Sequence, residues 1–142
     1  MADQADQMDQ AVPRSRHMSL ERKPTAKKAA ISYDGMGDGH TFFLPPAKED
    51  TEITGPLAAK LFVSSETTDA DLSLVVRLFS ADIKEVTFKG SVDPHTPIAQ
   101  GWLRASHRKL DTKKSKPWRP WHSHDEKQPL KPGSIYELDI EI

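Results

Sequence analysis

The 142-residue chain contains no cysteine, which excludes disulfide bridges, thiolate metal sites and a cysteine nucleophile. It has no apolar run near the roughly 20 residues of a membrane-spanning helix. Its N-terminus also lacks the basic and then apolar plan of a secretory signal. The formal net charge of -1 gives the whole molecule no attraction to nucleic acid or to an anionic membrane. These absences predict a soluble, cytoplasmic protein that binds neither nucleic acid nor membrane.

Signatures of catalysis are also missing. No G-x-S-x-G elbow occurs, which is the usual setting of the nucleophile in an α/β-hydrolase. Ser106 and His107 are adjacent, but neighbours on a strand point to opposite faces, so they do not form a dyad there. The glycine-rich run 34–39 fails as a calcium loop because Pro45 stands where an EF-hand needs glutamate. We therefore assign no catalytic, cofactor-binding or metal residue, and leave open whether the chain is an enzyme.

Two clusters of polar residues contain side chains that can bind metal ions. Asp69 and Asp71 precede an apolar run, and a solvated strand entrance explains them better than a metal site does. In "WHSHDE", His122 and His124 would lie on the same side of an extended chain, beside acidic residues. No third histidine has the spacing of a metal ligand, so ordinary hydrogen bonding is favoured for both histidines.

Short apolar runs separated by turn residues dominate the chain. They are rich in Val, Ile, Leu and Phe and are bounded by Gly, Pro, Asp or Ser, as strands are. The runs at 29–33 and 40–44 read as a hairpin or a pair of connected strands on either side of the glycine-rich segment. The other predicted strands are residues 56–65, 71–80, 85–90, 101–110 and 134–142. Helical patterns are nearly absent, so the sequence predicts an all-β protein with an antiparallel, jelly-roll-type β-sandwich.

The two ends of the chain differ in character. Residues 1–28 have little apolar periodicity and begin with a repeated Asp-Gln unit, so we predict a disordered leader or linker there and a folded domain over 29–142. The last residues alternate between apolar and acidic side chains up to Ile142, as in a half-buried strand. No turn or closing strand follows. We therefore expect an incomplete sandwich whose exposed strand edges favour self-association.

One segment, residues 111–128, has no periodicity and is predicted to be a long loop. From Arg104 to Lys131 there are nine Lys or Arg against three Asp or Glu, a local excess of six positive charges. Trp118 and Trp121 lie among these charges. Such a loop could bind single-stranded nucleic acid or a phosphate-rich ligand, or its tryptophans could pack against another domain.

The order of motifs resembles the C-terminal domain of the CocE/NonD hydrolases, a family of Xaa-Pro dipeptidyl-peptidases and cocaine-esterase-like acyl esterases. The most specific segments are "TEITGPLAAKLFVSS", "GWLRASHRKLD" and "LKPGSIYELDIEI", and the resemblance runs from about Ser32 to the last residue. It implies a jelly-roll, galactose-binding-like sandwich that packs on an α/β-hydrolase domain. The nucleophile, acid, base and oxyanion hole of the family belong to that other domain, so none transfers to a position here.

The resemblance implies a function as an accessory domain of a serine hydrolase, without catalytic machinery or cofactor of its own. Because a long Trp/His loop needs a burial partner, we expect Trp118, Trp121, His122 and His124 to form an interdomain surface. The alternative is a stand-alone jelly roll that binds a carbohydrate or an anionic ligand through the same loop, because the fold alone does not decide function.

Overall fold

The computed structural model describes residues 12–14, 19–21 and 29–142 of the chain. The chain forms two compact units, residues 1–52 and residues 53–142. The second unit contains the predicted Trp/His loop and most of the strands. No helix in the described residues has the length and apolar character needed to cross a membrane.

In the first unit, β1 (Val12–Arg14) and β2 (Ser19–Glu21) pair as antiparallel strands. Both lie within residues 1–28, for which the sequence predicts a disordered leader. These two triplets are paired in the structure. The rest of that segment lies outside the described residues, and there the leader stays a prediction.

The prediction of a hairpin or a pair of connected strands at residues 29–33 and 40–44 is wrong. Neither run forms a strand, and the two do not pair with each other. Phe43 instead makes an isolated parallel bridge with Ser19, and its carbonyl accepts a hydrogen bond from the Leu20 amide at 2.8 Å. Phe43 therefore pairs with a residue from an earlier part of the chain and not with the predicted run 29–33.

The glycine-rich segment between those runs does form the predicted turn. The Gly37 amide donates to the Asp34 carbonyl at 2.8 Å, and the Met36 amide donates to the Asp34 carboxylate at 3.0 Å. Asp34 thus uses its side chain to satisfy its own turn, which is the ordinary role of aspartate in such a position.

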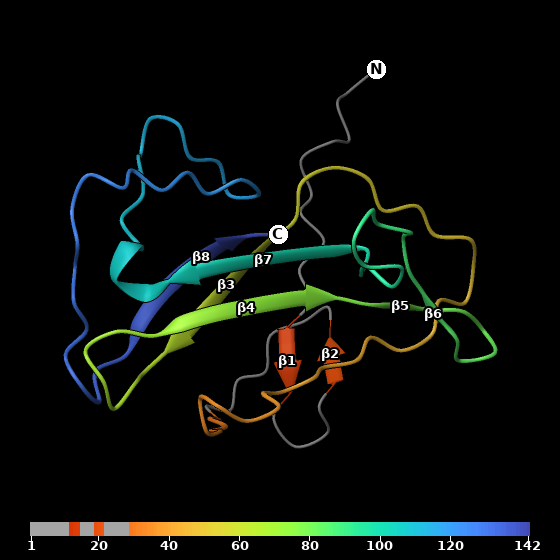
Figure 1. Ribbon diagram of the computed structural model, residues 1–142, viewed down its shortest axis with the longest axis horizontal. Coiled ribbons are helices and arrows are strands. Elements are labelled where there is room, and N and C mark those ends of the chain that lie inside the picture. The colour runs from red at the N-terminus through yellow and green to blue at the C-terminus, as the bar shows by residue number, and fades with distance from the viewer. Residues whose placement is uncertain (1–11, 15–18, 22–28) are drawn as a thin grey trace. The chain divides into compact units, whose positions relative to one another are not determined.

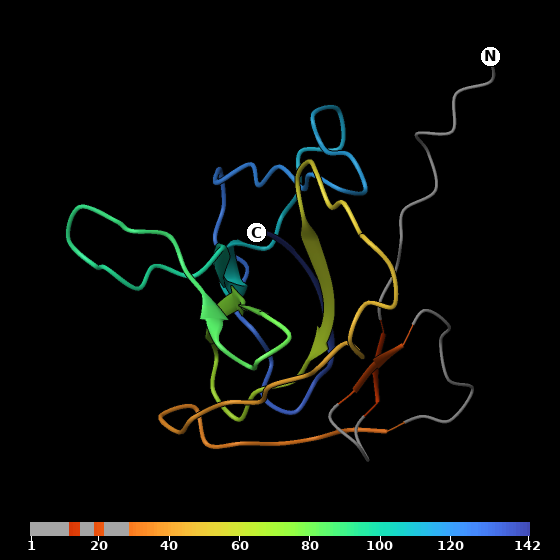
Figure 2. The same ribbon diagram turned by 90° about the vertical axis from the view of Figure 1, so that its right-hand side faces the viewer.

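Two antiparallel sheets make up the core of the second unit. Strand β3 (Ala58–Val63) pairs with β8 (Tyr136–Glu141), and β4 (Asp71–Val76) pairs with β7 (Ala99–Arg104). Figures 1 and 2 show the β3–β8 pair lying as a second layer against the β4–β7 pair. The two pairs are the layers of a sandwich, with apolar side chains between them.

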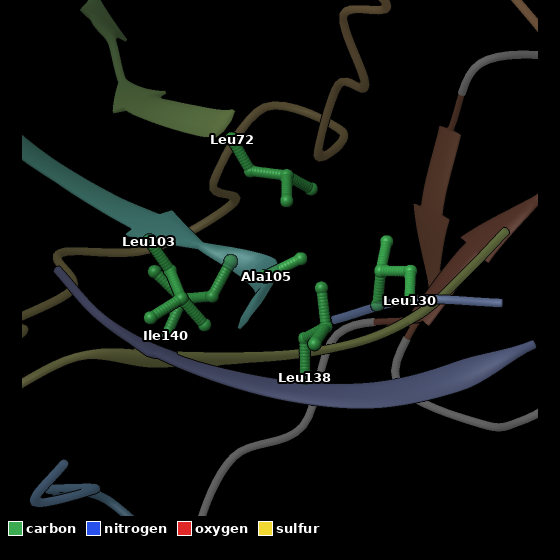
Figure 3. Packing of buried hydrophobic residues seen from close by; sticks show 6 residues of the cluster. All are labelled: Leu72, Leu103, Ala105, Leu130, Leu138 and Ile140. Atoms are coloured by element: carbon green, nitrogen blue, oxygen red, sulfur yellow. The ribbon is translucent and has the colours of Figure 1, made fainter. Parts of the chain in front are cut away.

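Alternation along each strand sends one set of side chains into the space between the sheets. Leu138 and Ile140 of β8 have no exposed surface, and Leu103 of β7 is 5% exposed. Figure 3 shows these side chains converging from the two layers. Burying each one stabilises the fold by about 1.5–3 kcal/mol. The buried apolar residues are Leu72, Leu103, Ala105, Leu130, Leu138 and Ile140.

The two layers lie very close together at Gly101 of β7. A Cβ atom added there would lie 2.1 Å from the carbonyl oxygen of Glu141, near the end of β8. Real Cβ atoms do not approach a backbone oxygen so closely, so one of the strands would have to move. Glycine at this position therefore allows the two sheets to meet.

Several predicted strands are shorter than their apolar runs. The run 71–80 is split between β4 and β5 (Leu78–Phe79), which pairs with β6 (Glu85–Val86) in a hairpin. The run 101–110 stops being a strand at Arg104. It continues as a 3-10 helix, Ala105–His107, because both donors of Ser106 are bound by a side chain rather than by a neighbouring strand.

The prediction of an all-β class is confirmed. In the part of the chain that the structure describes, the sheets are antiparallel and the only helix is the single turn Ala105–His107. The long loop 111–128 lies in the chain between β7 of one layer and β8 of the other, so the sandwich holds the segments on both sides of it.

Candidate functional site

The predicted long loop is folded back on itself by backbone pairing near its base. The Asp111 amide donates to the Trp121 carbonyl at 2.8 Å, and the Trp121 amide donates to the Ser115 hydroxyl at 3.0 Å. An isolated antiparallel bridge joins Leu110 to His122. These bonds satisfy backbone groups that a loop would otherwise leave to water, so the loop has a defined conformation.

The two tryptophans of the loop are partly exposed. Trp118 lies at the tip of a tight turn in which the amides and carbonyls of Lys116 and Arg119 bond reciprocally at 3.0 Å. It is 38% exposed, and Trp121 is 44% exposed. The ammonium of Lys114 lies 5.3 Å from the centre of the Trp121 ring, within the range of a cation–π contact. Each indole thus keeps part of its surface accessible.

Positive charges on the loop are partly compensated by acidic side chains of the same unit. Arg119 pairs with Glu141 of β8 at 3.3 Å. Lys109 pairs with Asp125 at 2.9 Å and with Glu126 at 3.6 Å. Acidic side chains therefore offset part of the local excess of positive charge that the sequence shows.

The histidines of "WHSHDE" meet a third one that the sequence argument did not connect with them. The ring centres of His122 and His124 are 6.0 Å apart, and those of His107 and His124 are 5.8 Å apart. His107 comes into reach because the chain turns into the 3-10 helix. No group of three or more histidine or acidic side chains in the described ranges has an arrangement that could hold a metal ion.

His122 and His124 differ in their surroundings. The Nε2 atom of His122 is buried and has no hydrogen-bond partner. Burial lowers the pKa of His122, and the charge of the neighbouring His124 ring lowers it further. His124 adopts a φ of 53°, in the left-handed region that non-glycine residues enter only under constraint. The neutral form of His122 is therefore favoured, beside a locally strained turn.

Asp125, which follows His124 in the chain, is held by two hydrogen bonds. Its carboxylate accepts hydrogen bonds from the Lys109 ammonium at 2.9 Å and from the Ser123 hydroxyl at 2.5 Å. The Lys109 bond, followed by the Ser123 bond, lowers the pKa of Asp125 to about 2. Asp125 is thus a structural acceptor that remains ionised at neutral pH.

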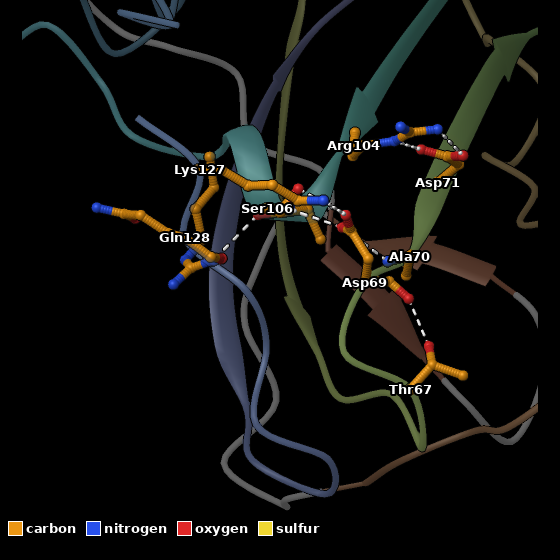
Figure 4. A network of polar contacts seen from close by, with 10 residues as sticks. Thr67, Asp69, Ala70, Asp71, Arg104, Ser106, Lys127 and Gln128 are labelled. Atoms are coloured by element: carbon orange, nitrogen blue, oxygen red, sulfur yellow. Dashed lines mark hydrogen bonds and ion pairs between the residues drawn. The ribbon is translucent and has the colours of Figure 1, made fainter. Parts of the chain in front are cut away.

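Ser106 is a structural residue rather than a nucleophile. It is fully buried, and its Oγ donates to Asp69 at 2.6 Å while its amide donates to the same carboxylate at 2.9 Å. Burial tends to raise the pKa of Asp69, but the bonds from Ser106 outweigh it and lower that pKa. Figure 4 shows this clasp between Asp69 and the 3-10 helix. The sequence argument against a Ser106–His107 dyad assumed a strand, whereas both residues lie in a 3-10 helix. The Ser106 hydroxyl is nevertheless unavailable as a nucleophile, because it is buried and bonded to Asp69.

The two aspartates at the entrance to β4 have different roles. Asp71 is exposed and accepts two hydrogen bonds from the Arg104 guanidinium, at 2.7 and 2.8 Å, which fits the predicted solvated entrance. Asp69 does not fit it, because it binds the buried Ser106. Around them is an open recess of about 240 Å³ lined by Asp69, Ala70, Asp71 and Arg104. It is smaller than the roughly 300–1,000 Å³ of typical ligand pockets.

Sequence reasoning overlooked Trp102. This residue of β7 is 71% exposed, more than Trp118 or Trp121. The signal was present in the sequence, because Leu103 faces the core and its strand neighbour must therefore face outward. Of the four predicted residues, the structure brings His122 and His124 together, and it places Trp118 and Trp121 on the same loop. Whether these four residues face another domain stays a prediction.

Comparison with known proteins gives a consistent family. A family model described as the X-Pro dipeptidyl-peptidase C-terminal non-catalytic domain matches residues 2–142. Two crystal structures of a CocE/NonD family hydrolase from Staphylococcus aureus are similar to the chain, with TM-scores of 0.83 and 0.82 and identities of 28% and 27%. The similarity covers 91% and 92% of this chain. No curated protein sequence matches it.

The chain spans about a quarter of the length of these hydrolases, since the match covers 24% of each. The family match also begins at residue 2, whereas the resemblance read from the sequence began near Ser32. The resemblance to the CocE/NonD hydrolases is confirmed. The chain belongs to the family of X-Pro dipeptidyl-peptidase C-terminal non-catalytic domains.

Proposed function

We propose that the chain is the accessory domain of a serine hydrolase that acts on Xaa-Pro peptides or acyl esters. The observation that carries this proposal is the match of a non-catalytic domain model over residues 2–142. The fold similarity to a hydrolase four times longer adds support. In this role the domain buttresses the catalytic portion and shapes one wall of its substrate cleft.

The loop 111–128 is the proposed contact with the catalytic portion. Its backbone pairing holds Trp118 and Trp121 in place, so binding a partner costs little further ordering of the loop. Both indoles are partly exposed, and tryptophan is enriched among the residues that contribute most to interfaces. His124 is exposed next to the partly buried His122 and provides polar atoms on the same loop.

A chimera tests this proposal directly. In it, the 142-residue chain replaces the matched quarter of the S. aureus hydrolase, and hydrolysis of a Gly-Pro dipeptidyl substrate and a short acyl ester is measured. We expect Trp118→Ala and Trp121→Ala to accelerate thermal inactivation at least about fivefold, equivalent to ~1 kcal/mol. Phe88→Ala, a 63% exposed aromatic away from the loop, is the matched control and should change little.

The same substitutions in the isolated chain separate docking from folding. Both tryptophans are substantially exposed, so the midpoint of thermal unfolding of the isolated chain should shift far less than that of the chimera. Equal effects in the chain and the chimera would show that the loop stabilises only its own domain, and would contradict the interdomain role.

A further inference from the structure

The outer face of the β4–β7 sheet carries an uncovered aromatic surface. Trp102 of β7 lies opposite Ser73 of β4 in the register, and Val75 is its diagonal neighbour. Trp102 is 71% exposed and Val75 is 53% exposed. Because the side chain of Ser73 is small, the strand partner of Trp102 does not shield the indole. We call Ser73, Val75, Gln100 and Trp102 the Trp102 face.

This face carries no uncompensated charge. At one end the Arg104 guanidinium binds Asp71 through two hydrogen bonds, at 2.7 and 2.8 Å, so the two charges cancel. The remaining members of the Trp102 face are neutral. An aromatic centre with a polar rim is the composition of an interface, in which charged groups are depleted from the core.

The outer face of the other sheet has a different composition. Strand β8 directs Glu137, Asp139 and Glu141 outward, and Lys60 of β3 pairs with the first two of these. Arg119 of the long loop pairs with Glu141. That face is thus acidic and holds its own counterions, and its exposed aromatic side chain, Phe62, lies directly opposite the charged Glu137.

We propose that the Trp102 face docks onto a neutral, apolar patch of the catalytic hydrolase portion, as a second contact beside the loop 111–128. The inference rests on the proposed function, because it takes the catalytic portion as the partner. The solved relatives carry about three quarters of their chain outside the match. A partner joined in the same chain is present at high effective concentration, so a modest neutral patch is enough to hold it.

Covalent footprinting of aromatic side chains tests the proposal. Labelling of Trp102 is compared between the isolated 142-residue chain and the chimera with the S. aureus hydrolase. Phe62, 68% exposed on the outer face of β3, is the matched control. We expect labelling of Trp102 to fall at least about fivefold in the chimera, while that of Phe62 stays within twofold.

Substitution provides a second readout. Trp102→Ala should speed proteolytic separation of the two parts of the chimera roughly thirtyfold, equivalent to ~2 kcal/mol for a central interface residue. Trp102→Phe should recover part of that loss. Phe62→Ala should match the unchanged chimera.

The outcomes separate this inference from the proposed function. If Trp102 stays fully labelled while Trp118 is protected, the second contact is wrong and the accessory role stands. If neither is protected, both proposals are overturned. If labelling of Trp102 falls in the isolated chain as its concentration rises, or on adding an oligosaccharide, a second copy or a sugar occupies the face, and the proposed partner is wrong.

Discussion

The two sheets of this domain share one core but present different outer faces. The β3–β8 face carries acidic side chains that are paired with Lys60 and Arg119. The β4–β7 face centres on Trp102, and its only charged pair, Arg104 and Asp71, is internally neutral. Since both sheets contribute apolar side chains to the one core, their different outer surfaces arise from the outward-facing residues. Along each strand, the inward-facing residues therefore stabilise the fold and the residues between them form the surface proposed for recognition.

Removing a shared core side chain should have the largest effect, since it weakens both sheets together. Leu138→Ala deletes a side chain with no exposed surface, and we expect a loss of about 2–5 kcal/mol in the free energy of unfolding. Phe62→Ala, on the outer face of the partner strand, should cost less than ~1 kcal/mol. Denaturant unfolding of both variants checks this, and equal losses would mean that β3 and β8 do not have distinct faces.

Gly101→Ala should force the two sheets apart without removing any contact. The new Cβ would lie 2.1 Å from the Glu141 carbonyl oxygen, so we expect a loss of about 1–3 kcal/mol. Gly35→Ala is the matched control, because a Cβ there meets nothing within 4 Å. Thermal unfolding compares the two variants. A neutral Gly101→Ala would show that the layers are not in close contact at this point.

The Asp69–Ser106 clasp joins the entrance of β4 to the end of β7. Asp69→Asn leaves a buried donor of Ser106 without a full partner, so we expect a loss of about 1–3 kcal/mol. Asp71→Asn disrupts only an exposed ion pair and should cost about 0–1 kcal/mol. Unfolding of both variants at pH 7 checks the difference, and a larger loss for Asp71→Asn would reverse the assigned roles.

The same clasp predicts the direction of acid sensitivity. The folded state lowers the pKa of Asp69, so its stabilisation is complete above the unfolded pKa of roughly 4 and is lost as pH falls through the lower folded value. Stability measured from pH 6 down to pH 2 should therefore fall below about pH 4. Asp69→Asn should flatten part of that decrease, whereas an unchanged profile would contradict the assignment.

The smallest effect is expected from the residue proposed for recognition. Trp102→Ala in the isolated chain removes an indole that is mostly in water, so its unfolding free energy should change by no more than ~0.5 kcal/mol. Thermal unfolding measures this. A loss above ~2 kcal/mol would mean that Trp102 supports the fold of its own domain rather than an interface.

Local periodicity predicted much of this fold. The inward positions Leu72 and Leu103 and the final strand through Ile140 follow from alternation of apolar and polar residues. The same rule would have identified Trp102 as exposed. Family resemblance supplied the accessory role, which the residues alone do not encode.

What the sequence could not predict depends on contacts between distant residues. Phe43 forms a backbone bridge with Ser19 and not with the nearby run 29–33. The predicted strand ended early because Asp69, 37 residues before Ser106, binds both of its donors. That change brought His107 to His124. Short-range patterns contain no information on such long-range side-chain contacts, so the histidine cluster was not predictable.

The most direct test of the accessory role is hydrolysis of a Gly-Pro dipeptidyl substrate and a short acyl ester by three purified proteins. These are the 142-residue chain, the catalytic portion of the S. aureus hydrolase, and the chimera that joins them. We predict no hydrolysis above background by the chain alone, and greater activity and heat resistance for the chimera than for the catalytic portion. Hydrolysis by the chain alone would contradict a non-catalytic role and would require a nucleophile outside every residue assigned here.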